Sequence, residues 1–189
     1  MKRIILASKS PRRRELLAGL TDTFEVITGE VDETLPEGID IREGTELLAV
    51  RKGAAVAEEE PHALVISSDT LVEVDGVALG KPADKGEAHS MLRSLSGRAH
   101  NVHTGVAVHY EGRVYSGVAT SSVVFKPLSD EEIDGYIATG EPMDKAGAYG
   151  IQGLGGKFVE RYIGDFDTVM GLSMKLVREL LCKAGGIDD

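Results

Sequence analysis

Residues 63–82 read Ala-Leu-Val-Ile-Ser-Ser-Asp-Thr-Leu-Val-Glu-Val-Asp-Gly-Val-Ala-Leu-Gly-Lys-Pro. The apolar run from Ala63 to Ile66 predicts a buried strand, which leads into the polar cluster 67–70 before apolar alternation resumes. Asp69 is a poor strand residue, and a carboxylate taken out of water costs several kcal/mol unless a cation or hydrogen-bond donors meet it. We therefore expect Asp69 to have a charged partner or a chemical role.

The next feature along the chain is a turn signal. Asp75-Gly76 is typical of a tight hairpin, which folds the following segment back on the strand. Lys81, just ahead of Pro82, is then expected towards the end of the sheet that carries Asp69. A carboxylate and a lysine would share one cleft.

The composition sets broad limits on the kind of protein. The chain has 189 residues, of which 42% are hydrophobic and 28% charged, as in an ordinary globular protein of one large domain or two closely joined lobes. No segment approaches the roughly 18 apolar residues of a membrane span, and the N-terminus lacks a signal-peptide core, so we expect a cytoplasmic protein without membrane contact. A single cysteine, Cys182, excludes an internal disulfide. The formal net charge of -10 disfavours nucleic acid as a partner.

The start of the chain departs from this acidic balance. Segment 4–7 predicts a strand, and Ser10-Pro11 begins a helix over 11–18 that ends at Gly19. Three arginines fall in the first turn, where the helix dipole is already positive. Positive charge is unfavourable at this end of a helix unless an anion binds there, so the three arginines indicate a bound anion. Backbone N–H groups, serine hydroxyls and guanidinium groups make a phosphate site; a solvated basic face is the alternative. The six basic residues of this patch are Lys2, Arg3, Lys9, Arg12, Arg13 and Arg14.

The middle of the chain supplies further candidates. A strand over 24–27 precedes an acidic stretch with Asp32 and Glu33, which is either a surface loop or a source of metal ligands. A helix over 45–60 places Leu47, Leu48 and Val50 towards the core and Lys52 on another face. A capped helix over 84–95, a long hairpin over 101–125 and a capped helix from Ser129 to near 140 follow.

The hairpin carries three histidines, His100, His103 and His109. Their spacing is too wide for a shared metal, so we interpret them as structural.

The stretch 140–156 is rich in glycine, which lets the backbone approach a ligand closely, and it carries side chains able to hydrogen-bond, Gln152 among them. It lacks the spacing of a P-loop or of a Rossmann fingerprint, so neither mechanism applies. A strand over 157–163 and a closing helix over 168–183 complete the expected elements.

Five motifs in register resemble the Maf family of nucleotide pyrophosphatases over nearly the whole chain. They are Ala-Ser-Lys-Ser-Pro-Arg-Arg-Arg-Glu-Leu-Leu (7–17), Ser-Asp-Thr (68–70), Gly-Lys-Pro (80–82), Met-Leu-Arg-Ser-Leu-Ser-Gly (91–97) and Asp-Lys-Ala-Gly-Ala-Tyr-Gly-Ile-Gln-Gly (144–153). The resemblance implies one domain over 1–189 with an α/β fold: a mixed, curved central sheet flanked by helices with a cleft between two lobes, similar to the inosine triphosphatases. It also implies a house-cleaning enzyme, often a homodimer, that cuts dTTP, UTP and modified pyrimidine nucleotides to the monophosphate and pyrophosphate with Mg²⁺ or Mn²⁺.

The resemblance also assigns roles to residues. Asp69 matches the family's proton acceptor, and Glu33 and Asp69 match acids at the metal. The substrate-selecting positions are matched by Arg12, Thr70 and Gln152, and the phosphate-binding positions by Ser8, Arg12, Arg13, Lys52 and Lys81. Lys52 is followed by a glycine where the family usually has alanine, and Gly-Leu-Ser stands at 171–173 in place of Gly-Leu-Pro.

Hydrolysis would proceed by in-line attack of water on the α-phosphorus, helped chiefly by positioning and charge neutralisation. Asp69 would act as general base or as metal ligand, and the sequence leaves both open. Gln152 offers one donor and one acceptor, which suits the imide edge of thymine or uracil. The alternatives are a nucleotide-binding regulator of septum formation that does not turn over, and a phosphatase that releases orthophosphate first. Nucleic-acid binding ranks last because no aromatic platform accompanies the basic patch.

Overall fold

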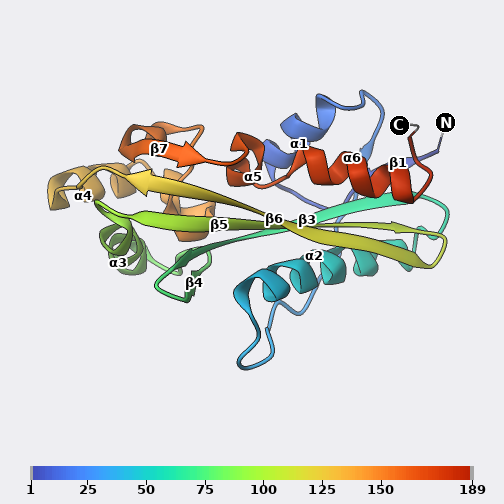
Figure 1. The fold of residues 1–189 in the computed structure, drawn as a ribbon, viewed down its shortest axis with the longest axis horizontal. Helices are drawn as coiled ribbons and strands as arrows, with labels where there is room; N and C mark the ends of the chain where they lie inside the picture. Colours follow the sequence, from blue (N-terminus) through green and yellow to red (C-terminus); the bar gives the residue numbers. More distant parts are fainter. Residues whose placement is uncertain (1, 188–189) are drawn as a thin grey trace. The chain divides into compact units, whose positions relative to one another are not determined.

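A mixed seven-stranded sheet with helices packed against it runs through the computed structural model, which describes residues 2–187 (Figure 1). The strand order is β2-β1-β3-β5-β6-β7, with β4 paired to β3. β1 is parallel to β2 and β3, whereas β3–β4 and β6–β7 are antiparallel. The strands are β1 Ile4–Leu6, β2 Glu25–Val26, β3 Leu64–Val74, β4 Val77–Leu79, β5 Ala99–Tyr110, β6 Arg113–Phe125 and β7 Val159–Ile163. The predicted mixed sheet flanked by helices is confirmed.

Six α-helices and three 3-10 helices lie in the described part of the chain. The α-helices are α1 Pro11–Ala18, α2 Ile41–Ala57, α3 Lys85–Leu95, α4 Asp130–Ala138, α5 Phe166–Met170 and α6 Met174–Lys183; the 3-10 helices are η1 Glu141–Asp144, η2 Ala146–Ala148 and η3 Leu154–Phe158.

Local signals account for most of these boundaries. Ser10 caps α1, and Ser129 and Glu132 form a reciprocal capping box at α4, as predicted. Two predictions were wrong. α2 begins four residues before the predicted Thr45, because the Asp40 carboxylate accepts from the N–H groups of Arg42 and Glu43. The closing helix is broken into α5 and α6, because Gly171 has a φ of 113° and Ser173 caps a new helix.

The chain divides into two compact units, each made of separate stretches of sequence. The first contains residues 2–69, 104–119 and 171–187, and the second contains residues 70–103 and 120–170. β3 passes from the first unit into the second between Asp69 and Thr70. The prediction of a single domain over 1–189 and that of a cleft between lobes stay predictions.

The first unit has helices on both faces of its part of the sheet: α1 and α6 on one face and α2 on the other (Figure 1). Because side chains alternate along a strand, neighbouring residues contribute to different cores. Ile66 of β3 packs with Leu17 of α1 and Leu181 of α6, whereas Val65 packs with Val56 of α2. The face towards α2 is therefore the odd-numbered face of β3.

The second unit has one hydrophobic core, in which α3 and α4 pack with the second half of β3 and with β5 and β6. Its aromatic residues meet edge to face: Phe125 with Tyr149 at 4.7 Å between ring centroids, and Tyr136 with Phe158 at 5.1 Å. The glycine-rich stretch is tied into this core through Tyr149, which is only 5% exposed.

Among residues 2–187, no helix is long and apolar enough to cross a membrane.

Candidate active site

Asp69 lies on the odd-numbered face of β3, opposite α2, together with Ser67. The Ser67 hydroxyl donates to the carbonyl of Ala49 in α2, at 2.7 Å. Two residues further along, Asp69 Oδ1 accepts from Lys52 Nζ at 2.5 Å. Asp69 is only 7% exposed, so its charge is paired where little water reaches it. The expectation that Asp69 needs a charged partner is confirmed.

Lys52 lies on the side of α2 that faces the sheet. The buried residues of that side include Leu48, Ala49 and Val56, and Lys52 is three or four positions away from each of them. The prediction that Lys52 occupies another face was wrong, because it relied on Leu47 and Val50 as core residues, and both are only partly buried. The helix thus brings an ammonium group onto the carboxylate of Asp69.

Glu33 joins this cluster from the loop before α2. Its Oε1 lies 2.9 Å from Lys52 Nζ, so two carboxylates converge on one ammonium group. The neighbouring Asp32 has a local structural role, since its Oδ1 accepts from the N–H of Thr34 at 2.8 Å. Hydrogen bonds from the Thr34 hydroxyl and from this N–H lower the pKa of Asp32. Arg51 donates to the carbonyls of Asp32 and Thr34, which fixes the loop on both sides of Glu33.

Gly53, next to Lys52, allows α2 to approach the sheet closely. A Cβ at this position would lie 2.4 Å from His109 Cδ2 and 2.6 Å from Ser67 Oγ. His109 itself is held by the carbonyl of Val50, 3.1 Å from its Nε2. The glycine that departs from the usual family pattern is therefore explained by the histidine packed against it.

We expect Gly53→Ala to lower the free energy of unfolding by about 1–3 kcal/mol, because the new methyl group overpacks this contact, although alanine is the better helix former. Urea unfolding measures the change. Adding His109→Ala to the Gly53→Ala variant should relieve part of the loss of stability. The double variant should then be more stable than the sum of the two single effects predicts. Simple additivity of the two changes would contradict this explanation.

The start of α1 gathers hydroxyl and guanidinium groups around Ser8. The Ser8 hydroxyl oxygen accepts from the N–H of Ser10 at 3.2 Å and from Arg13 NH1 at 3.3 Å, which leaves its own proton to donate. Arg13 Nε donates to the carbonyl of Gly171 at 2.7 Å, and Ser68 Oγ donates to the same carbonyl at 2.9 Å. Burial lowers the pKa of Arg13, while the nearby Asp69 carboxylate acts in the opposite direction. Ser8 and Arg13 are thus brought to the same region as Asp69.

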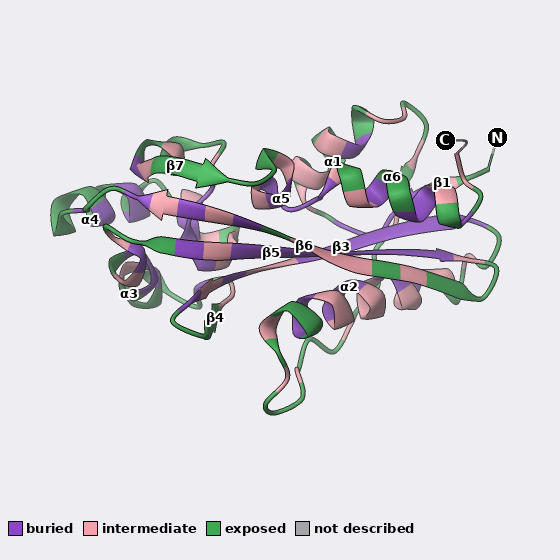
Figure 2. Cartoon of the chain, in the orientation of Figure 1, coloured by how far each residue is buried: buried purple, intermediate pink, exposed green. Residues whose placement is uncertain are grey.

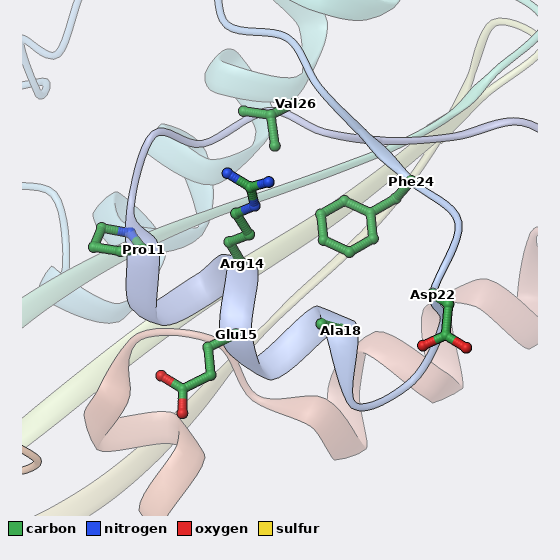
Figure 3. Close-up of a pocket in the computed structure, with 7 residues that line it drawn as sticks. All are labelled: Pro11, Arg14, Glu15, Ala18, Asp22, Phe24 and Val26. Atoms are coloured by element: carbon green, nitrogen blue, oxygen red, sulfur yellow. The ribbon is translucent and has the colours of Figure 1, made fainter.

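Lys2, Arg3 and Arg14 of the basic patch make their contacts elsewhere. Arg3 forms ion pairs with Glu25 and Glu60, and Lys2 lies over the ring of Tyr110. Arg14 is exposed and lines a pocket of about 540 Å³ on the outer side of α1, next to Phe24 and Val26 (Figure 3). Apart from Arg14 of the basic patch, that pocket contains none of the predicted site residues. Of the three arginines of α1, Arg12 and Arg13 are partly buried, whereas Arg14 is exposed.

The other predicted residues belong to the second unit. Thr70 follows Asp69 on β3 and therefore points to the opposite face of the sheet. Lys81 follows β4, and the carbonyl of Gly80 accepts from the N–H of Gly147 at 3.1 Å. The second unit thus joins the Lys81 segment to the glycine-rich stretch. Gln152 is exposed in the loop between η2 and η3.

The three histidines of β5 have protein partners, which confirms their structural interpretation. His103 lies between Glu73 and Thr120, with its Nδ1 2.8 Å from the Thr120 hydroxyl, and His100 Nε2 lies 2.7 Å from the hydroxyl of Tyr149. Burial lowers the pKa of His100 to about 4. Within residues 2–187, no group of three or more His, Cys, Asp or Glu side chains is arranged to hold a metal ion.

His100 should make stability depend on pH. Its folded pKa is below the unfolded value of 6.5, so the unfolded state binds the proton more strongly and stability falls as the pH drops from 6.5 through about 4. The contribution is on the order of 3 kcal/mol. Urea unfolding of the protein and of His100→Gln at several pH values measures it. Equal pH slopes for the two proteins would mean that His100 keeps an ordinary pKa.

Comparisons with known proteins show which proteins the chain resembles. The family model described as Maf-like protein matches residues 3–184. A relative from Bacillus velezensis named dTTP/UTP pyrophosphatase is 46% identical over 187 residues, covering 97% of this chain and 99% of its own. One of the same name from Pelotomaculum thermopropionicum is 49% identical and covers 98% of both chains. The solved Staphylococcus aureus Ham1 protein matches 98% of this chain with a TM-score of 0.53 and 18% identity, a likeness of fold alone that agrees with the predicted α/β fold.

Proposed function

The chain belongs to the Maf family, and from this premise we propose that it is a nucleoside triphosphate pyrophosphatase that hydrolyses dTTP and UTP to the monophosphate and pyrophosphate. The observation that carries the proposal is the carboxylate Asp69, buried and paired with Lys52 in a region that also holds Ser8 and Arg13. A site that only bound anions would have no use for a carboxylate facing phosphate.

In the proposed reaction, the oxygen of a water molecule forms a bond to the α-phosphorus while the bond to the oxygen that bridges the α- and β-phosphorus breaks. Asp69 accepts the proton of the water, and pyrophosphate leaves. Ser8, Arg12 and Arg13 bind phosphate oxygens from α1, with Lys52 and Lys81 as further cations. They act mainly by neutralising charge and by fixing the line of attack.

A divalent cation fits the acidic residues of the first unit. Glu33 and Asp69 already converge on one cationic group, the ammonium of Lys52, and their oxygens are the hard ligands that Mg²⁺ or Mn²⁺ prefers. Two carboxylates are enough when triphosphate oxygens and water supply the remaining ligands. When bound, the cation would neutralise phosphate charge. Chelation by EDTA should abolish hydrolysis, and added Mg²⁺ or Mn²⁺ should restore it.

Base selection is assigned to Arg12, Thr70 and Gln152. The exposed amide of Gln152 has one donor and one acceptor, which match the O4 and the N3–H of thymine or uracil. A modified pyrimidine with the same edge would be accepted as well.

Product analysis tests the function. The purified protein is incubated with Mg²⁺ or Mn²⁺ and with dTTP, UTP, CTP, GTP or 7-methyl-GTP, and the products are separated by ion exchange. Monophosphate and pyrophosphate from dTTP and UTP alone are expected. Orthophosphate as the first product would indicate a phosphatase. Nucleotides that bind and remain intact would indicate a regulator of cell division without turnover.

We also propose a cytoplasmic homodimer, joined through β7. β7 is the last strand on its side of the sheet, and four of its five residues are exposed (Figure 2). Tyr162, Ile163 and Phe166 are 45%, 66% and 38% exposed, more apolar surface than an edge strand normally leaves open. Light scattering should give a dimer for the protein and a monomer for Ile163→Glu.

A further inference from the structure

Gln152 lies at the exposed part of a loop whose two sides are held by the second unit. On one side, the N–H of Gly150 donates to the hydroxyl oxygen of Tyr136 at 3.2 Å. Tyr136 is only 1% exposed, and its ring packs edge to face on Phe158, so this anchor is fixed in the core. Within the loop, the N–H of Gly153 donates to the carbonyl of Gly150 at 3.3 Å.

Glu141 holds the other side of the loop. Its Oε1 accepts from the N–H of Leu154 at 2.9 Å and its Oε2 from the N–H of Gly155 at 3.0 Å. The Tyr136 hydroxyl also bonds to this carboxylate. Burial alone would raise the pKa of Glu141, but these hydrogen bonds outweigh it and the pKa is lowered. Glu141 is therefore ionised at neutral pH and keeps acceptors for both N–H groups.

The glycines of this loop make room for the two anchors. A Cβ on Gly153 would lie 1.7 Å from Glu141 Oε1, and a Cβ on Gly155 would lie 2.6 Å from the Tyr136 hydroxyl. We interpreted the glycines as a means for backbone to approach a ligand. At these two positions the group approached is the protein's own Glu141 or Tyr136.

A fixed loop matters because of the chemistry of the amide. Thymine offers an acceptor at O4 and a donor at N3, whereas cytosine offers a donor at N4 and an acceptor at N3. A glutamine amide that is free to flip, so that its oxygen and its nitrogen exchange places, pairs equally well with either base. Only an amide held in one orientation discriminates, which requires the backbone that carries it to be fixed.

We propose that Glu141 and Tyr136 are positioning residues that hold Gln152 for base discrimination; this inference rests on the proposed function. Glu141 acts on residues 154–155 and Tyr136 on Gly150, so that Gln152 is clamped from both sides. Neither residue touches the base itself.

The test is the ratio of kcat/KM for dTTP over dCTP. Glu141→Gln replaces one acceptor by an amide N–H₂ that faces a backbone N–H donor, and it should lower the ratio about tenfold, mostly through a higher KM for dTTP. Tyr136→Phe, which removes only the hydroxyl, should lower the ratio in the same direction. Glu131→Gln makes the same chemical change at an exposed residue of α4 and should leave the ratio unchanged.

A double-variant cycle separates positioning from general stability. In a Gln152→Ala background, Glu141→Gln should change the ratio no further, since the residue through which it acts is gone. A lower melting temperature with an unchanged ratio would overturn the inference, and so would an effect of Glu141→Gln that persists without Gln152. If the unaltered protein hydrolyses no nucleotide, the proposed function itself has failed.

Discussion

Asp69→Asn is expected to reduce kcat for dTTP about 1,000-fold, the scale of a lost general base. The amide keeps the size and one acceptor for Lys52 Nζ but can neither take a proton from water nor offer a charged ligand. The KM should change much less, because the cationic groups that bind the triphosphate remain. Steady-state kinetics with dTTP and pyrophosphate detection measure both quantities.

Asp32→Asn is the matched control for this experiment. Asp32 lies next to Glu33, but its carboxylate closes a turn onto Thr34, and an asparagine side chain closes such a turn as well. Activity within about twofold of the unaltered protein is expected, since no charge at the Lys52 cluster is lost. An Asp69→Asn enzyme with near-normal turnover and intact Mn²⁺ binding would exclude Asp69 both as base and as metal ligand.

Arg13→Ala should lower kcat/KM for dTTP about 100-fold, while Arg14→Ala should change it less than about twofold. The two arginines are neighbours with equal charge, yet Arg13 reaches Ser8 and Gly171 and Arg14 lines the outer pocket. A fixed guanidinium that stabilises phosphate charge typically contributes a factor of this size. The comparison separates a specific phosphate contact from the general attraction of a basic patch.

Salt dependence distinguishes the same two arginines in a second way. If long-range attraction of the substrate alone mattered, both substitutions would lower kcat/KM equally. Increasing ionic strength would then remove the loss in both variants. Because Arg13 is expected to contact substrate, its effect should persist at high salt. Melting temperatures of both variants show whether the lost bond to Gly171 also destabilises the fold.

The elements with strong local signals were predictable from the sequence. The Ser10-Pro11 start of α1 and the Asp75-Gly76 turn behave as expected, the latter with φ of 52° and 74° at its two residues. The sequence indicates a special role for Asp69, because a charge inside a buried strand is unfavourable unless a cation or hydrogen-bond donors meet it. Its pairing with a cation follows from that same physical argument.

What the sequence did not reveal depends on contacts between distant segments. The side of α2 that carries Lys52 could not be found from apolar spacing, because glycine and alanine make up much of the buried side and they give little periodic signal. The role of Glu141 was also missed. Its position in Gly-Glu-Pro indicates a turn, and nothing local predicts that it binds two N–H groups thirteen and fourteen residues away.

β3 places Asp69 and Thr70 side by side in the chain, on opposite faces of one extended strand. A deletion or insertion of a single residue between the start of β3 and this pair would exchange their faces, turning the carboxylate away from α2 and the hydroxyl towards it. Insertions and deletions are therefore not tolerated within this segment. Descendants of this protein that acquire new substrates must do so by substitution here, or by changes in loops such as 150–156, where the chain can lengthen without moving Asp69.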